Sequence, residues 1–221
     1  DPRRTTSAQW ADVWMGLHVG GDIALANAMA REIIHAGLAN TTFIERATTG
    51  FEAYRAAVEP YTLERTERIT GVPAEVIREA ALTYARADRA VICWTLGITE
   101  HHNATDNVLA LINLSLVTGH VGRYGSGLSP LRGQNNVQGG GDMGAIPNRL
   151  VGFQDFHDAA IRGRFEQAWN VTLQPEYGWT VTEMLEAAER GELTSLFVIG
   201  ENPAQSEADQ HHTDALLKGL D

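Results

Sequence analysis

A polar, glycine-rich stretch from Leu128 to Asn148 carries the residue types best suited to bind a charged ligand. It contains the guanidinium of Arg132, followed by the side-chain amides of Gln134, Asn135, Asn136 and Gln138. Glycines are unfavourable inside a helix, and glycines and amides are poor material for a buried strand. We therefore expect neither element here, but a segment offering backbone N–H groups, amides and a guanidinium fork to phosphate or carboxylate. Composition alone leaves a solvated loop as the alternative.

The charge around this stretch differs from that of the whole chain. The 221 residues include 17 Lys+Arg and 28 Asp+Glu, a net charge of −11. This acidity argues against nucleic acid or an anionic membrane surface as a partner. Between residues 120 and 150, however, Arg123, Arg132 and Arg149 face a single acid, Asp142. A locally cationic segment in an acidic protein suits an anionic ligand.

The cysteine content and the ends of the chain narrow the class of protein further. The single cysteine, Cys93, excludes an internal disulfide and a cysteine-only metal site in this chain. Its apolar neighbours predict that it is buried and unreactive.

No apolar run approaches the length of a membrane span, so we expect no direct membrane insertion. The chain opens at Asp1 without an initiator Met and reads as an interior piece; we expect a cytoplasmic parent, with the periplasm as the alternative.

Apolar periodicity predicts helices that alternate with short strands. Helical spacing recurs over residues 22–36, 41–59 in two pieces, 62–70, 74–87, 103–118, 159–169, 183–190 and 207–218. Two apolar runs, residues 90–94 and 195–199, have strand length and are expected to be buried on both faces. The alternation indicates an α/β fold of two αβα subdomains with largely parallel sheets, residues 1–134 and 135–221, the second incomplete.

Each predicted strand leads into a glycine and then into polar residues. Residues 90–94 precede Gly97 and His101, and residues 195–199 precede Gly200, Glu201 and Asn202. Open α/β sheets bind ligands beyond the carboxyl ends of their strands, where helix N-termini attract anions. One such loop is usually a simple turn, but its recurrence beside a cationic segment favours a nucleotide-like cofactor. Adjacent histidine pairs lack chelating spacing, so we expect no metal ligand in this chain.

Several strings resemble the catalytic subunit of molybdenum- or tungsten-dependent formate dehydrogenases, which are bis-molybdopterin guanine dinucleotide oxidoreductases. The most specific is Arg-Gly-Gln-Asn-Asn-Val-Gln-Gly at residues 132–139. Others follow the family's order across the whole chain: Asp-Pro-Arg at 1–3, Gly-Gly-Asp at 20–22, Gly-Ile-Thr-Glu-His at 97–101, Asp-Met-Gly-Ala at 142–145 and Gly-Glu-Asn-Pro at 200–203.

The resemblance implies oxidation of formate to carbon dioxide at a metal, Mo or W, held by two pterin dithiolenes. The second subdomain would then be the later half of a discontinuous domain. An iron–sulfur cluster would lie in a region upstream of this chain, and the electrons would pass to electron-transfer subunits of the parent complex.

The resemblance also implies roles for individual residues. Arg132 matches the active-site arginine that pairs with formate, and Gly133 and Gln134 would contact the pterin. The other cofactor contacts form two groups. The first is Asp1, Arg3, Asp22, Gly97 and His101; Asp1, Arg3 and Asp22 would lie along one guanine dinucleotide, with the Asp22 carboxylate accepting from the guanine amine. The second is Gly200, Glu201 and Asn202, which would contact the other dinucleotide.

Some features of the family are not found here. The metal's Cys or selenocysteine ligand and the His after it would lie upstream of Asp1, and Glu100 stands where Gln is usual. Two alternatives therefore stay open: another molybdopterin oxidoreductase, such as a nitrate reductase-like enzyme, and a non-catalytic electron-transfer scaffold subunit of the same fold. Arg132 argues against the nitrate reductases, which usually lack it.

Overall fold

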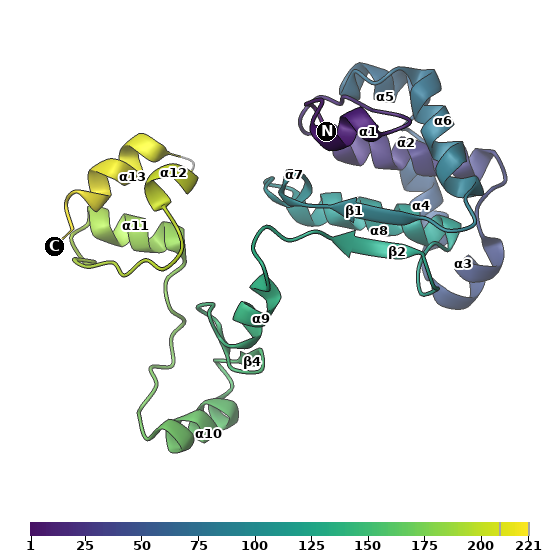
Figure 1. The fold of residues 1–221 in the computed structure, drawn as a ribbon. Coiled ribbons are helices and arrows are strands. Elements are labelled where there is room, and N and C mark those ends of the chain that lie inside the picture. Colours follow the sequence, from purple (N-terminus) through teal and green to yellow (C-terminus); the bar gives the residue numbers. More distant parts are fainter. Residues whose placement is uncertain (208, 221) are drawn as a thin grey trace. The chain divides into compact units, whose positions relative to one another are not determined.

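The computed structural model describes residues 1–207 and 209–220, and the chain divides into two compact units, Asp1–Gly133 and Gln134–Asp221. The first unit is built mainly of helices with one small sheet (Figure 1). Its elements are α1 (Thr6–Trp10), α2 (Asp22–His35), α3 (Thr41–Ala47), α4 (Phe51–Val58), α5 (Leu63–Thr70), α6 (Ala74–Arg86), β1 (Val91–Trp94), α7 (Leu96–Thr99), α8 (Ala104–Thr118) and β2 (Gly127–Pro130). No helix in the described ranges is long and apolar enough to cross a membrane.

Helix α2 lies at the centre of the first unit because it contributes to both of its apolar clusters. One cluster joins α2 to α4, α6 and α8 through Ala30, Ile33, Val58, Ala81, Leu114 and Val117. The other joins α2 to α5 and α6 through Leu17, Ala28, Leu63, Val72 and Ile77. The buried Glu32 on α2 is paired with Arg31 and Arg78, each at 3.0 Å, which offsets the cost of placing a carboxylate in the interior.

The sheet of the first unit consists of β1 and β2 paired in parallel, with Val91 opposite Gly127 and Trp94 opposite Pro130. Burial alternates along β1: Ile92 packs against the first apolar cluster, whereas Val91 and Cys93 are exposed. The prediction that this strand is buried on both faces, and Cys93 with it, was wrong. A continuous apolar run does not reveal how many faces are covered, and in the described residues helices cover only one.

The second unit contains less regular structure and little core. Its elements are α9 (Val137–Asp142), β3 (Arg149–Leu150), β4 (Gln154–Asp155), α10 (Ala159–Trp169), α11 (Val181–Glu189), α12 (Pro203–Ser206) and α13 (Gln210–Leu217). Strands β3 and β4 form a short antiparallel pair. Among its described residues only Leu150, Ala187 and Thr213 are buried.

The strand predicted at residues 195–199 is wrong, because these residues are neither paired nor buried. Phe197 is 89% exposed and Ile199 is 80% exposed. An apolar run becomes a strand only when a neighbouring strand satisfies its backbone groups, and none does so in the described part of the second unit. The fold class nevertheless holds, since the described residues combine many helices with a small parallel sheet.

The expectation that the glycine-rich stretch forms no regular element was also wrong. Its start belongs to β2, and residues 137–142 form the short helix α9 despite three consecutive glycines. A Cβ at Gly139 would overlap the side-chain amide of Asn136, the residue before α9. Glycine at this position therefore leaves the Asn136 amide in place, whereas a larger residue would require the amide to move.

Candidate functional site

A cavity of about 440 Å³ opens at the carboxyl end of β1 in the first unit. Its walls come from three separate parts of the sequence: the N-terminal segment, the turn into α2, and the connection from β1 to α7. The lining residues are Asp1, Pro2, Arg3, Leu17, Val19, Asp22, Cys93, Trp94, Thr95, Gly97, Ile98 and His101. The size is typical of a small-molecule site, and the position follows the rule for open α/β sheets.

The N-terminal wall is held by local hydrogen bonds. The Asp1 carboxylate accepts from the backbone N–H of Arg3 at 2.8 Å, and the Trp14 indole donates to the Asp1 carbonyl at 3.0 Å. The guanidinium of Arg4 lies over the Trp14 ring, 5.8 Å from its centre. The Arg3 guanidinium has no hydrogen bond or ion pair with another described residue. This wall therefore offers an exposed cation to a ligand.

The second wall is the turn that leads into α2. The backbone N–H of His18 donates to the Thr70 carbonyl at 2.7 Å, and that of Gly21 donates to the His18 carbonyl at 3.0 Å. These bonds fix the turn against α5. Asp22 is the first residue of α2 and is half-buried, and its carboxylate has no partner among the described side chains. It is therefore an acceptor available to a ligand.

The third wall follows β1. The carbonyl of Gly97 lies 3.0 Å from His101 Nε2, and the buried Asn107 donates to the Ile98 carbonyl at 3.0 Å. These bonds hold α7 beside the end of the strand. The structure thus brings together five of the residues singled out in the sequence, namely Asp1, Arg3, Asp22, Gly97 and His101.

Arg132 and Gly133 follow the end of β2 in the same unit. The backbone N–H of Leu131 donates to the Trp94 carbonyl at 2.7 Å, which extends the pairing of the two strands by one residue. Because β1 and β2 are parallel, their carboxyl ends share an edge of the sheet. Arg132 is exposed at that edge, and its guanidinium forms no ion pair with a described residue.

The other residues singled out in the sequence belong to the second unit and do not line this cavity. Gln134 is exposed at the start of the unit, and Gly200, Glu201 and Asn202 form the turn into α12. Hydrogen bonds from the Ser206 hydroxyl and the Asn202 backbone N–H hold the pKa of the Glu201 carboxyl below its usual range. The Glu201 charge is thus stabilised by its own turn.

Sequence reasoning missed the apolar part of the cavity wall. Leu17, Val19, Trp94 and Ile98 line it, although residues 90–94 were expected to form a fully buried strand, and Cys93 is exposed there. The available signal was position, since the last residues of a strand before a glycine loop reach the ligand edge of a sheet. In the described ranges no group of three or more His, Cys, Asp or Glu could hold a metal ion.

A sequence profile of the molybdopterin oxidoreductase family matches residues 1–221, and the chain belongs to that family. It is 41% identical over 221 residues to the F420-dependent formate dehydrogenase subunit alpha of Methanocaldococcus jannaschii, covering all of this chain and 32% of that protein. It is 42% identical over 210 residues to formate dehydrogenase H of Escherichia coli, covering 95% of this chain and 29% of that protein.

A solved structure supports the fold. Acetylene hydratase from Pelobacter acetylenicus matches the whole chain with a TM-score of 0.68 at 23% identity, over 33% of its own length. The chain thus spans about a third of the length of each of these proteins.

Proposed function

We propose that this chain is part of the catalytic subunit of a formate dehydrogenase that oxidises formate to carbon dioxide. The names of its relatives support this proposal, since those at 40–42% identity are formate dehydrogenases. The cofactor would be bis-molybdopterin guanine dinucleotide with Mo or W. An iron–sulfur cluster would lie upstream of this chain, and electrons would leave through partner subunits.

The cavity is the observation that carries the proposal, because residues from three distant segments converge in it. Its donor set fits one nucleotide arm of the cofactor: Arg3 offers a cation to phosphate, and Asp22 offers an acceptor to the guanine amine. The apolar walls, including Trp94, suit the faces of a purine ring and would keep water away from it. Residues 1–134 would form this dinucleotide domain, and residues 135–221 the later half of a second one, in which Gly200, Glu201 and Asn202 serve the other arm.

Arg132 would act on the substrate. When bound, the cofactor supplies a metal centre able to accept two electrons. The part of this chain is to orient formate, because a guanidinium fork can hold a carboxylate through two parallel hydrogen bonds. The exposed position of Arg132, just beyond β2, leaves both arms of the fork available.

Two variants of the full-length protein test the proposal, one through its cofactor content and the other through its kinetics with formate. Asp22→Asn keeps a polar side chain in the first turn of α2 but removes the charged acceptor, so the content of guanine nucleotide and metal should fall about tenfold or more. Arg132→Lys keeps the charge but loses the fork, so cofactor content should stay normal. Its kcat/KM for formate should fall roughly 30- to 1000-fold, as expected for losing about 2–4 kcal/mol of transition-state stabilisation.

Metal analysis and steady-state kinetics on the same preparations distinguish the outcomes. Normal cofactor content in Asp22→Asn would show that the cavity is not part of the cofactor site. If Arg132→Lys oxidised formate as fast as the wild type, Arg132 would not act on the substrate. Nitrate reduction without formate oxidation by the wild type would favour the nitrate reductase-like alternative, and absence of bound metal would favour the scaffold.

A further inference from the structure

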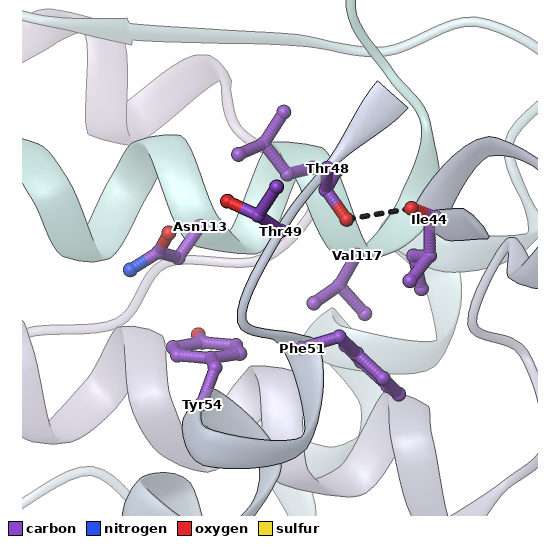
Figure 2. A pocket seen from close by; sticks show the side chains of 8 residues that line it. Ile44, Thr48, Thr49, Phe51, Tyr54, Asn113 and Val117 are labelled. Carbon is purple, nitrogen blue, oxygen red and sulfur yellow. Dashed lines mark hydrogen bonds between the residues drawn. The ribbon is translucent and has the colours of Figure 1, made fainter. Parts of the chain in front are cut away.

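A second, smaller cavity of about 40 Å³ lies in the first unit, away from the candidate cofactor site, where α3, α4 and α8 meet. It is lined by Ile44, Thr48, Thr49, Phe51, Tyr54, Asn113, Leu116 and Val117. Figure 2 shows the Tyr54 hydroxyl, the Thr49 hydroxyl and the Asn113 amide near one another on one side of this cavity. The other walls are largely apolar.

The Tyr54 hydroxyl differs from the other two polar groups in its burial. The Tyr54 hydroxyl oxygen is buried and has no hydrogen-bond partner among the described residues. Thr49 is exposed and Asn113 is half-buried, and their side chains form no hydrogen bond within the described ranges, so both can bind water at the mouth of the cavity. Thr48 differs, because its hydroxyl donates to the Ile44 carbonyl at 2.7 Å (Figure 2). Buried polar groups are normally paired, so the unpaired Tyr54 hydroxyl beside a cavity with two further polar side chains points to a polar occupant.

The size of the cavity decides what that occupant is. A water molecule needs roughly 10–15 Å³ of such space and two to four polar partners, so the cavity has room for about two or three waters. We propose that this cavity is a hydration site in which water bridges the buried Tyr54 hydroxyl, the Thr49 hydroxyl and the Asn113 amide. The burial that raises the pKa of the Tyr54 phenol keeps it protonated as a donor.

The bridge would have a structural role. Thr49 lies in the connection between α3 and α4, Tyr54 on α4 and Asn113 on α8. Shared water would tie these three segments together where few direct polar contacts exist. Opening of the connection would then require that the bridge be broken.

Hydrogen exchange of the full-length protein, read from the peptide that covers residues 48–54, tests the proposal. Tyr54→Phe removes only the hydroxyl. Loss of one water-mediated hydrogen bond should speed exchange in this peptide about fivefold. Thr49→Val should have a similar effect, and the double variant should exchange little faster than either single one, because both lose the same bridge. The exposed Tyr124→Phe is the matched control and should change nothing.

Other outcomes would overturn the proposal. Slower or unchanged exchange in Tyr54→Phe would mean that the hydroxyl is unpaired, since removing an unpaired buried group does not destabilise a protein. Simply additive effects would mean that no bridge is shared. A crystal structure that resolves ordered water should show density within hydrogen-bond distance of the Tyr54 hydroxyl, and a dry cavity would contradict the assignment whatever the exchange rates.

Discussion

The two units of the chain share the same kinds of helix signal but differ in what covers their apolar residues. In the first unit, α2 lies between two apolar clusters, and Ile33 and Ile77 are fully buried. In the second, α10 and α11 are well capped by Asp158 and Thr180, yet few residues are buried. Local capping is therefore enough to define a helix end, whereas a core requires contacts between segments distant in sequence.

The same difference separates the two sets of candidate site residues. The five in the first unit converge in one cavity because packing around α2 brings the N-terminal segment, the turn into α2 and the end of β1 together. In the second unit, Gly200, Glu201 and Asn202 are neighbours in sequence and form one turn. Convergence of distant residues is evidence for a site, whereas adjacency in a turn is not.

The largest expected effect is a difference in the free energy of unfolding between alanine variants of two isoleucines. Ile33→Ala removes a fully buried side chain from the first apolar cluster and should lower the free energy of unfolding by about 2–5 kcal/mol. Ile199→Ala, at an 80% exposed position, should change it by less than about 0.5 kcal/mol. Urea denaturation of the two variants measures both. A large loss for Ile199→Ala in the full-length protein would break the comparison, because it would show that residues 195–199 are buried there.

The next effect compares two glycines that end helices with positive φ. Gly71, after α5, has φ +74°, and Gly191, after α11, has φ +72°. A Cβ at Gly71 would lie 2.6 Å from His18 Nε2, whereas a Cβ at Gly191 would meet nothing within 4 Å. Gly191→Ala should cost about 1–2 kcal/mol from backbone strain alone. Gly71→Ala should cost up to about 1 kcal/mol more, because the exposed His18 ring must turn away and lose its contact with the Ile69 carbonyl.

The Gly71 variant also reaches the candidate site, because Leu17 and Val19, on either side of His18, line the cavity. Cofactor content should therefore fall in Gly71→Ala and stay normal in Gly191→Ala. Equal losses of stability and of cofactor in the two variants would show that the His18 contact does not matter.

A smaller effect depends on pH and on His120, which is buried at the end of α8. Its Nε2 lies 3.0 Å from the Tyr84 carbonyl, and its Nδ1 accepts from the Arg123 guanidinium at 2.9 Å. Burial lowers the pKa of His120 below 6.5, and the Arg123 charge adds to this, while the Tyr84 carbonyl and the charge of Asp88 oppose it.

The sign of the pH effect follows from that lowered pKa. Below about pH 6.5, His120 is protonated in the unfolded state but still neutral in the folded state. The contribution of His120 to the free energy of unfolding is therefore fully present above that pH and is lost as the pH falls through the folded-state pKa. Denaturation at a series of pH values should show a decline that His120→Gln abolishes. The exposed His211→Gln is the control. A decline that persists in His120→Gln would assign it to other groups.

Most helices and the loop after β1 could be predicted from the sequence because their signals are local. Residues 41–59 form two helices, α3 and α4, and α8 ends at Thr118, as apolar periodicity predicted. The exposure of Cys93 could not be predicted, since it depends on how many faces of β1 are covered. Nor could the helix α9, because its three consecutive glycines have low helix propensity.

For the site, family motifs selected residues and packing decided which of them meet. Asp1, Asp22 and His101 are far apart in sequence, and no local pattern places them in one cavity. The apolar wall residue Trp94 was missed because its residue type is equally typical of a core. Spatial convergence was therefore the information that the sequence lacked.

The smallest expected effect compares two threonine caps. The Thr180 hydroxyl accepts from the backbone N–H of Glu183 at 3.4 Å, and the Glu183 carboxylate accepts in return from the backbone N–H of Thr180 at 2.6 Å. The Thr62 hydroxyl accepts from the backbone N–H of Arg65 at 3.3 Å at the start of α5. Replacing either threonine with Ala should cost about 1 kcal/mol.

The consequences of these two losses should differ, because the helices differ in burial. Helix α5 packs through Leu63, Thr66 and Thr70, whereas α11 has Ala187 as its one buried residue. Hydrogen exchange should therefore speed up along the whole of α11 in Thr180→Ala, but only in the first turn of α5 in Thr62→Ala. Equal, terminal-only effects would show that α11 is held by tertiary contacts as firmly as α5, and the contrast between the two units would not extend to their helices.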